Sequence, residues 1–182
     1  MGWPNLKLKR PHINIAYDKS REDAFLNDSH TPEEVLGHYV ELCKGEYRLV
    51  VKPKRSTRLS KMATTYYRQI RLPSNWAEME PRRQANLLAH EWRHTKQWRK
   101  WGKVRFACKY LMSRRFRAAV EIECYCESAR AMKSMGYTQK SIDLFAVRIP
   151  NMMVDSYQLR GLNRDDFRGH FQNAVMKSIG SE

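Results

Sequence analysis

The stretch PRRQANLLAHEWRHTKQWRKWG, residues 81–102, decides the fold of this chain. Proline is tolerated in the first turn of a helix and glycine is common just past the last, so Pro81 and Gly102 bracket one predicted helix. Within it, His90 and His94 lie one turn apart on the same face. The prediction is a helix of about six turns that presents two neighbouring imidazoles.

Residues 90–94 read H-E-x-x-H, because Glu91 follows His90. Two imidazoles at this spacing can bind one zinc ion, and a catalytic zinc site adds a third protein ligand and leaves a fourth position for water. Glu91 is rotated about 100° around the helix, so it could reach that water without being a ligand. The pattern predicts zinc as cofactor, with His90 and His94 as ligands and Glu91 as catalytic base. The alternative is a basic amphipathic helix with a chance spacing of histidines.

In metzincins, the residues after H-E-x-x-H supply a glycine and then a third histidine ligand. This chain has Gln97 and Lys100 at those two positions, so the third ligand must come from elsewhere. A helix expected over about 114–135, ending at Gly136, offers glutamates instead. Its predicted apolar stripe consists of Ala118, Ile122, Tyr125, Ala129 and Met132.

Glu121 borders this stripe, where a carboxylate is costly unless it is paired or bound to metal. Glu123 is expected to point toward Glu127 and Arg130 on a polar face, which needs no special explanation. Glu121 is therefore the favoured third metal ligand, and Glu123 is the alternative. Cys124 and Cys126 are expected to be packed thiols, since residues two apart on a helix point in different directions.

The segment LLAHEWRH (87–94), the glycine that ends its helix and the downstream glutamate-bearing helix resemble the gluzincin branch of the zincin metallopeptidases. Small bacterial and bacteriophage metallopeptidases with H-E-x-x-H are the nearest likeness, over about residues 64–130. The resemblance implies a zincin-like fold, a peptide or protein substrate, and Glu121 as ligand. The family often has alanine and aspartate where this chain has Cys124 and Tyr125, so the Tyr125 hydroxyl would have to support a histidine instead.

Strand-like stretches precede the long helix, at 12–17, 47–52 and 64–72. The resemblance implies that 64–72 is an edge strand that binds extended substrate. An ordinary edge strand protected by Arg68 and Arg71 is the alternative. Thr31, Pro32, Glu34 and Gly45 predict a capped helix near the N-terminus. Further helices are expected over about 139–149, ending before Pro150, and about 164–178.

These elements indicate an α+β fold, in which a small N-terminal mixed β-sheet is followed by the active-site helix and a helical C-terminal half. At 182 residues, the chain is expected to form one zincin-like domain spanning 1–182. The start, MGWPNLKLKRPH, has no apolar core of a signal peptide, and no apolar run reaches membrane-spanning length. A cytoplasmic or virion-associated protein with no membrane partner is expected.

The net charge of +15 favours polyanionic partners, namely nucleic acid or an acidic protein, and a merely solvated surface is an equal alternative. Lys and Arg recur along most of the length, and contacts with phosphate are expected mainly from those in the 52–61 loop and the 96–117 region. Trp92, Trp98 and Trp101 could stack on bases but are more typical of core anchors. Beside the zinc metallopeptidase, a second function is therefore carried forward: a basic nucleic-acid-associated or phage virion structural protein with a zincin fold and little or no proteolysis.

Overall fold

The computed structural model describes residues 24–44, 47–52, 63–157 and 163–180, and the side chains of 155–156 are not described. The described chain is mixed α and β, mostly helical, with one small sheet. The expected α+β class is therefore confirmed at this level. The strand expected at 12–17, Gly45 and nearly all of the basic 52–61 loop lie outside the described residues.

The sheet has three strands, β1 (Arg48–Val51), β2 (Thr64–Tyr66) and β3 (Gln69–Leu72), in the order β1-β3-β2. β1 pairs in parallel with β3, and β2 pairs antiparallel with it, so the sheet is mixed as expected. The prediction of one strand over 64–72 was wrong. The chain reverses at Tyr67, whose φ of +53° makes the tight turn, and Thr64 thereby pairs with Arg71.

Helix α2 (Pro32–Cys43) begins as its sequence predicts. The Thr31 hydroxyl accepts from the backbone N–H of Glu34, and the Glu34 carboxylate accepts from the backbone N–H of Thr31. This reciprocal pair satisfies two of the backbone donors that a helix start leaves free. The helix buries Val35 and Tyr39 against the long helix Pro81–Trp101.

The two long helices also match their predicted bounds. They are α3 (Pro81–Trp101) and α5 (Arg114–Ser134). Between them lies α4 (Lys103–Met112), a helix that the sequence did not predict. Gly102 separates α3 from α4 with a φ of +75°, a conformation that glycine adopts at no steric cost. The glycine therefore marks a change of direction and not the end of helical structure.

Helix α6 (Gln139–Ser156) contradicts the prediction of an end before Pro150, and α7 (Arg164–Ser178) matches its expected bounds. Pro150 is buried within α6 and lacks the N–H that a helix interior normally uses. The turn after it buries Met153 and Val154 in the same apolar cluster as Phe171. This burial explains why the helix continues past the proline.

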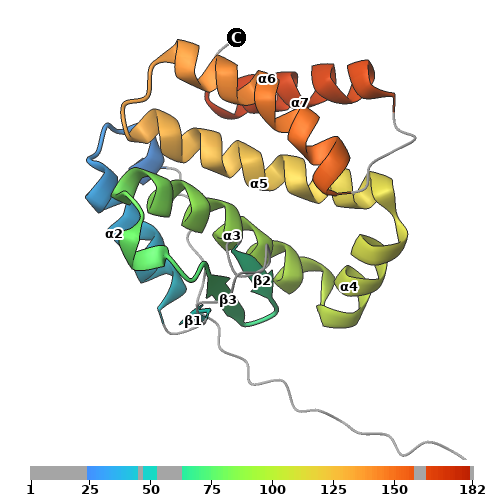
Figure 1. The fold of residues 1–182 in the computed structure, drawn as a ribbon, viewed down its shortest axis with the longest axis horizontal. Helices are drawn as coiled ribbons and strands as arrows, with labels where there is room; N and C mark the ends of the chain where they lie inside the picture. Colours follow the sequence, from blue (N-terminus) through green and yellow to red (C-terminus); the bar gives the residue numbers. More distant parts are fainter. Residues whose placement is uncertain (1–23, 45–46, 53–62, 158–162, 181–182) are drawn as a thin grey trace, which may run out of the picture.

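Helix α5 lies in the middle of the molecule, with α6 and α7 on one side and α3 on the other (Figure 1). The sheet and α2 lie beyond α3. The face of α5 toward α6 and α7 is the apolar stripe expected from the sequence: Ala118, Ile122, Tyr125, Ala129 and Met132. All of these side chains are buried except Tyr125, which is partly buried. Its opposite face carries polar and small residues that are also buried: Glu121, Cys124, Glu127, Ser128 and Ala131. Two polar helix faces, one from α3 and one from α5, therefore meet inside the molecule.

Glu127 corrects one part of the sequence interpretation, because it is buried and does not lie on an exposed polar face. Its Oε1 accepts a hydrogen bond of 2.7 Å from the buried Tyr39 hydroxyl, and its Oε2 lies 3.4 Å from Nη1 of Arg130. The carboxylate thus links α2 to α5 across α3.

Substitution Tyr39→Phe is expected to lower the free energy of unfolding by about 1.5–3 kcal/mol, because it removes a donor to a buried carboxylate. Tyr66→Phe, at an exposed hydroxyl, is the matched control and should change it by less than about 0.5 kcal/mol. Urea denaturation followed by circular dichroism measures both. Equal effects of the two substitutions would contradict a stabilising role for this hydrogen bond.

None of the helices in the described ranges is long and apolar enough to cross a membrane.

Candidate metal centre

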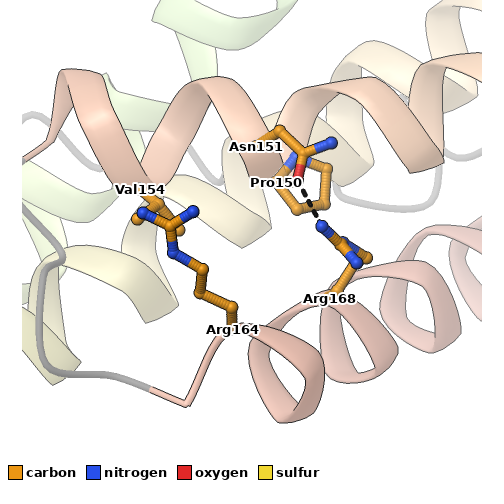
Figure 2. Close-up of a pocket in the computed structure, with 5 residues that line it drawn as sticks. All are labelled: Pro150, Asn151, Val154, Arg164 and Arg168. Atoms are coloured by element: carbon orange, nitrogen blue, oxygen red, sulfur yellow. Dashed lines mark hydrogen bonds between the residues drawn. The ribbon is translucent and has the colours of Figure 1, made fainter.

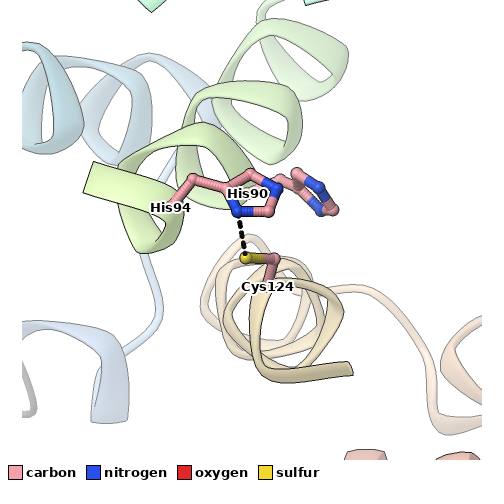
Figure 3. A group of neighbouring side chains, drawn as sticks. All are labelled: His90, His94 and Cys124. Carbon is pink, nitrogen blue, oxygen red and sulfur yellow. Dashed lines mark hydrogen bonds between the residues drawn. The ribbon is translucent and has the colours of Figure 1, made fainter. Parts of the chain in front are cut away.

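Three side chains that can bind metal converge between α3 and α5 (Figure 3). His90 and His94 come from α3, where their rings lie edge to face with centroids 5.0 Å apart. Cys124 comes from α5, and ligand atoms of the three residues all lie within 4.8 Å of one another. The group could hold a metal ion.

Glu121 lies at the same place, between the two histidines. Its Oε2 is 3.4 Å from Nε2 of His90, and its Oε1 is 3.4 Å from Nε2 of His94. The residue is only 1% exposed, and Oε2 accepts no hydrogen bond from the described residues. A buried carboxylate oxygen without a donor is costly, and a cation between it and the two imidazoles would compensate that cost.

Glu123, the alternative ligand, is on another side of α5. Its Oε2 lies 3.2 Å from Nη2 of Arg93 and 3.2 Å from Nε2 of Gln97. It therefore faces α3 and not Arg130, as the sequence interpretation had it. Of the two glutamates, the structure brings only Glu121 to the histidines.

Gln97 fixes the orientation of one histidine ring. Its amide nitrogen donates to the Val120 carbonyl oxygen at 2.7 Å, which turns its Oε1 toward Nδ1 of His94 at 2.9 Å. When His94 is neutral, a proton on Nδ1 would satisfy this contact and leave the Nε2 lone pair available to a metal ion. The sequence interpretation considered Gln97 only as a residue that replaces a glycine.

Cys124 approaches the other side of the same ring, with Sγ 3.4 Å from Nδ1 of His94 and 3.6 Å from Oε1 of Gln97. Two ligand sets are therefore geometrically available. In one, metal binds Nε2 of both histidines and Glu121. In the other, metal binds His90, Nδ1 of His94 and Cys124, which requires His94 to give up its contact with Gln97.

The charges of these groups differ between the two sets. Burial raises the pKa of Glu121, but the two imidazoles outweigh burial and hold this pKa far below its ordinary range. Burial raises the pKa of the Cys124 thiol to about 12. Burial lowers the pKa of His94, but Cys124 and Glu121 outweigh it and raise the pKa well above its ordinary value. At neutral pH the carboxylate is ionised and can bind a cation, whereas the Cys124 thiol and the imidazolium of His94 must each lose a proton before they can bind one.

Three tyrosines surround this group. The Tyr110 hydroxyl, from α4, donates to Oε1 of Glu121 at 2.6 Å. Tyr125 lies edge to face with His90, at a centroid distance of 4.5 Å, and its hydroxyl is 3.5 Å from that of Tyr157. The Tyr125 hydroxyl thus contacts a tyrosine, although its sequence position suggested support for a histidine. Tyr110 supports Glu121 instead, from a helix that was not predicted.

Glu91 is buried on α3 and contacts the sheet. The Thr65 hydroxyl, from β2, lies 2.6 Å from Oε2 of Glu91 and 3.1 Å from its backbone oxygen. The shorter contact identifies the carboxylate as the acceptor of the single hydroxyl proton. Through Thr65, the edge strand β2 thus holds the Glu91 carboxylate in place.

The other histidines of the described ranges lie elsewhere. His170 is exposed on α7, which packs on the opposite side of α5 from α3 (Figure 1). His30 and His38 stack on the Phe25 ring, with centroid distances of 3.8 and 4.0 Å. Trp92 and Trp98 are buried, as expected of core anchors, and Trp101 is partly exposed.

A hollow lies between α6 and α7 (Figure 2). Its lining residues are Pro150, Asn151, Val154, Arg164 and Arg168. The Arg168 guanidinium donates to Oδ1 of Asn151 at 2.7 Å and lies 3.4 Å from Asp165. This arginine therefore links two helices, and no nucleophile or base accompanies it in the lining.

Comparison of the chain with protein-family models, curated proteins and solved structures finds no match. The geometry alone therefore defines the site: two histidines, a carboxylate and a thiol form a group that could hold a metal ion.

Proposed function

We propose that the chain is a zinc-dependent metallopeptidase of zincin type, in which His90, His94 and Glu121 hold the ion and Glu91 is the general base. The observation that carries this proposal is the position of Glu121. Its ionised, buried carboxylate faces Nε2 of both histidines, at 3.4 Å each, with one oxygen that accepts no hydrogen bond from the described residues.

The donor set fits zinc. Zinc binds imidazole nitrogen and carboxylate oxygen at about 2.0–2.2 Å, and catalytic sites have three such protein ligands. The present 3.4 Å separations would accommodate an ion between the groups after small side-chain shifts. When bound, zinc supplies a Lewis acid that polarises the substrate carbonyl and makes water easier to deprotonate.

Glu91 performs the proton transfers in this proposal. It takes a proton from the attacking water and passes it to the amine that leaves. Thr65 supports this role by holding Oε2 of Glu91 at 2.6 Å and so limiting the rotamers of the carboxylate. Since β2 is an edge strand of the sheet, an extended peptide could pair with it beside Glu91.

Tyr110 is a positioning residue in this account, because its hydroxyl holds Oε1 of Glu121 at 2.6 Å. Tyr110→Phe is expected to weaken zinc binding about 10- to 100-fold, as is typical when a partner of a metal ligand is removed. Competition with a chromogenic chelator measures the affinity. Tyr137→Phe is the control and should leave it unchanged; an unchanged affinity in Tyr110→Phe would contradict the role.

The proposal is tested by measuring zinc per chain in the purified protein and cleavage of a mixture of random peptides by mass spectrometry. One zinc ion per chain together with new peptide termini would support it. Stoichiometric zinc without cleavage would favour the alternative of a binding or virion protein with little proteolysis. Protein that binds no zinc at all would contradict both the metal centre and the reaction.

A further inference from the structure

The segment between Glu91 and Glu121 contains no acidic residue. It contributes ten cations to a chain whose net charge is +15: Arg93, Lys96, Arg99, Lys100, Lys103, Arg105, Lys109, Arg114, Arg115 and Arg117. In the structure this segment forms the second half of α3, all of α4 and the start of α5. The segment runs through α4 and the adjoining ends of α3 and α5 at one end of the molecule (Figure 1), which is therefore rich in cations.

Four of these cations gather over the rings of Trp101, Tyr66 and Tyr67. Around the Trp101 indole, Lys109 Nζ lies 4.3 Å, Arg105 Cζ 5.2 Å and Lys100 Nζ 5.7 Å from a ring centroid. Lys103 Nζ lies 5.3 Å from the Tyr66 ring and 5.7 Å from the Tyr67 ring. We call these seven residues the α4 basic surface: Tyr66, Tyr67, Lys100, Trp101, Lys103, Arg105 and Lys109.

These four cations have no carboxylate partner among the described residues, in contrast to Arg93, which pairs with Glu123. Arg117 is likewise satisfied, because it donates to the backbone oxygens of Tyr110, Leu111 and Tyr157. Within the described ranges, only ring faces balance the positive charge of these four cations, and ring faces attract cations weakly where they are exposed.

Exposed rings accompany the cations. The Tyr66 and Tyr67 side chains at the β2–β3 turn are 51% and 40% exposed. Tyr67 makes the turn with a φ of +53°, which is uncommon for residues other than glycine. A ligand that matches this surface must offer anionic groups and flat faces together, and nucleotides offer both.

We propose that the α4 basic surface binds single-stranded nucleic acid, with Lys100, Lys103, Arg105 and Lys109 on phosphates and the tyrosines on bases. Single strands are favoured over duplex because their bases are free to stack on aromatic rings. The surface contains neither the proposed metal ligands nor Glu91, so this binding does not require peptidase activity, although Tyr66 belongs to the strand β2 that is proposed to pair with a peptide substrate.

The test measures fluorescence anisotropy of a fluorescein-labelled 20-nucleotide oligo-dT and of a 20-base-pair duplex, at 50–200 mM NaCl. The α4 variant carries Lys100→Gln, Lys103→Gln, Arg105→Gln and Lys109→Gln. A control variant removes the same charge from exposed positions elsewhere: Arg83→Gln, Lys140→Gln, Arg148→Gln and Lys177→Gln. Each phosphate that the variant no longer neutralises lowers the log affinity–log salt slope by about 0.7 for a single strand.

The wild type is expected to bind oligo-dT more tightly than duplex. The α4 variant should lose about tenfold or more in affinity at 50 mM salt and up to about 3 in slope, and the control variant much less. Tyr67→Asn, which keeps a residue tolerant of positive φ, should weaken oligo-dT binding about 5- to 100-fold by removing one stacking ring.

No binding to oligo-dT at 50 mM salt would overturn the proposal, and so would equal losses in the α4 and control variants. A lipid surface would instead use the exposed apolar side chains of α4, namely Val104, Leu111 and Met112. Replacing these three by serine should leave oligo-dT binding intact. Binding only to vesicles of phosphatidylcholine and phosphatidylglycerol, abolished by these serines, would assign the surface to lipid and contradict our proposal.

Discussion

Replacing Glu121 by glutamine is expected to reduce bound zinc from about one ion per chain to almost none. The amide removes the negative charge that faces Nε2 of His90 and His94, and a neutral amide is a poor ligand for zinc. His90→Ala should have the same effect, because only one imidazole would remain. Elemental analysis after dialysis against metal-free buffer measures the loss.

Two control variants make this result specific. Glu123→Gln changes the same residue type on the same helix, where the carboxylate contacts Arg93 and Gln97, and should retain zinc. Cys124→Ser should also retain it, because the thiol lies on the Nδ1 side of His94. Zinc retained by Glu121→Gln but absent from Cys124→Ser would show that the sulfur and not the carboxylate is the ligand.

Glu91→Gln is expected to lower peptide cleavage about 10²- to 10⁴-fold while zinc stays bound. Glutamine has the shape of glutamate and can still accept the hydrogen bond from Thr65, but it cannot take a proton from water. The measurement is the initial rate of cleavage of a peptide found in the library assay, with zinc determined on the same sample.

Glu80→Gln, at an exposed position before α3, is the matched control and should cleave at the wild-type rate. Equal rates for Glu91→Gln and wild type would remove Glu91 from the reaction. Loss of zinc from Glu91→Gln would show that Glu91 holds the ion, directly or through the fold.

The sequence predicted those helices whose ends carry strong local signals. The capping box at Thr31 and Glu34 defines the start of α2, and Gly102 and Gly136 follow the ends of α3 and α5. The errors arose where tertiary packing overrides such signals. Burial of the turn after Pro150 keeps α6 helical, and Tyr67 makes the β2–β3 turn in place of the glycine or asparagine that usually marks one.

The candidate site was predictable only where one helix supplies the spacing. The one-turn separation of His90 and His94 follows from helical geometry, and the apolar stripe on α5 set the phase that favoured Glu121 over Glu123. Gln97, Tyr110 and Thr65 had no such signal. Their contacts depend on how α4, α5 and β2 dock against α3, which no local pattern specifies. Cys124 was expected to be only a packed thiol for the same reason.

X-ray absorption at the zinc edge of the purified protein tests the central claim most directly, because it identifies the ligand atoms. The account predicts one zinc ion per chain with only nitrogen and oxygen neighbours at about 2.0–2.2 Å, including the scattering pattern of two imidazoles. A sulfur neighbour at about 2.3 Å would contradict the ligand set of His90, His94 and Glu121, and protein without zinc would contradict the metal centre itself.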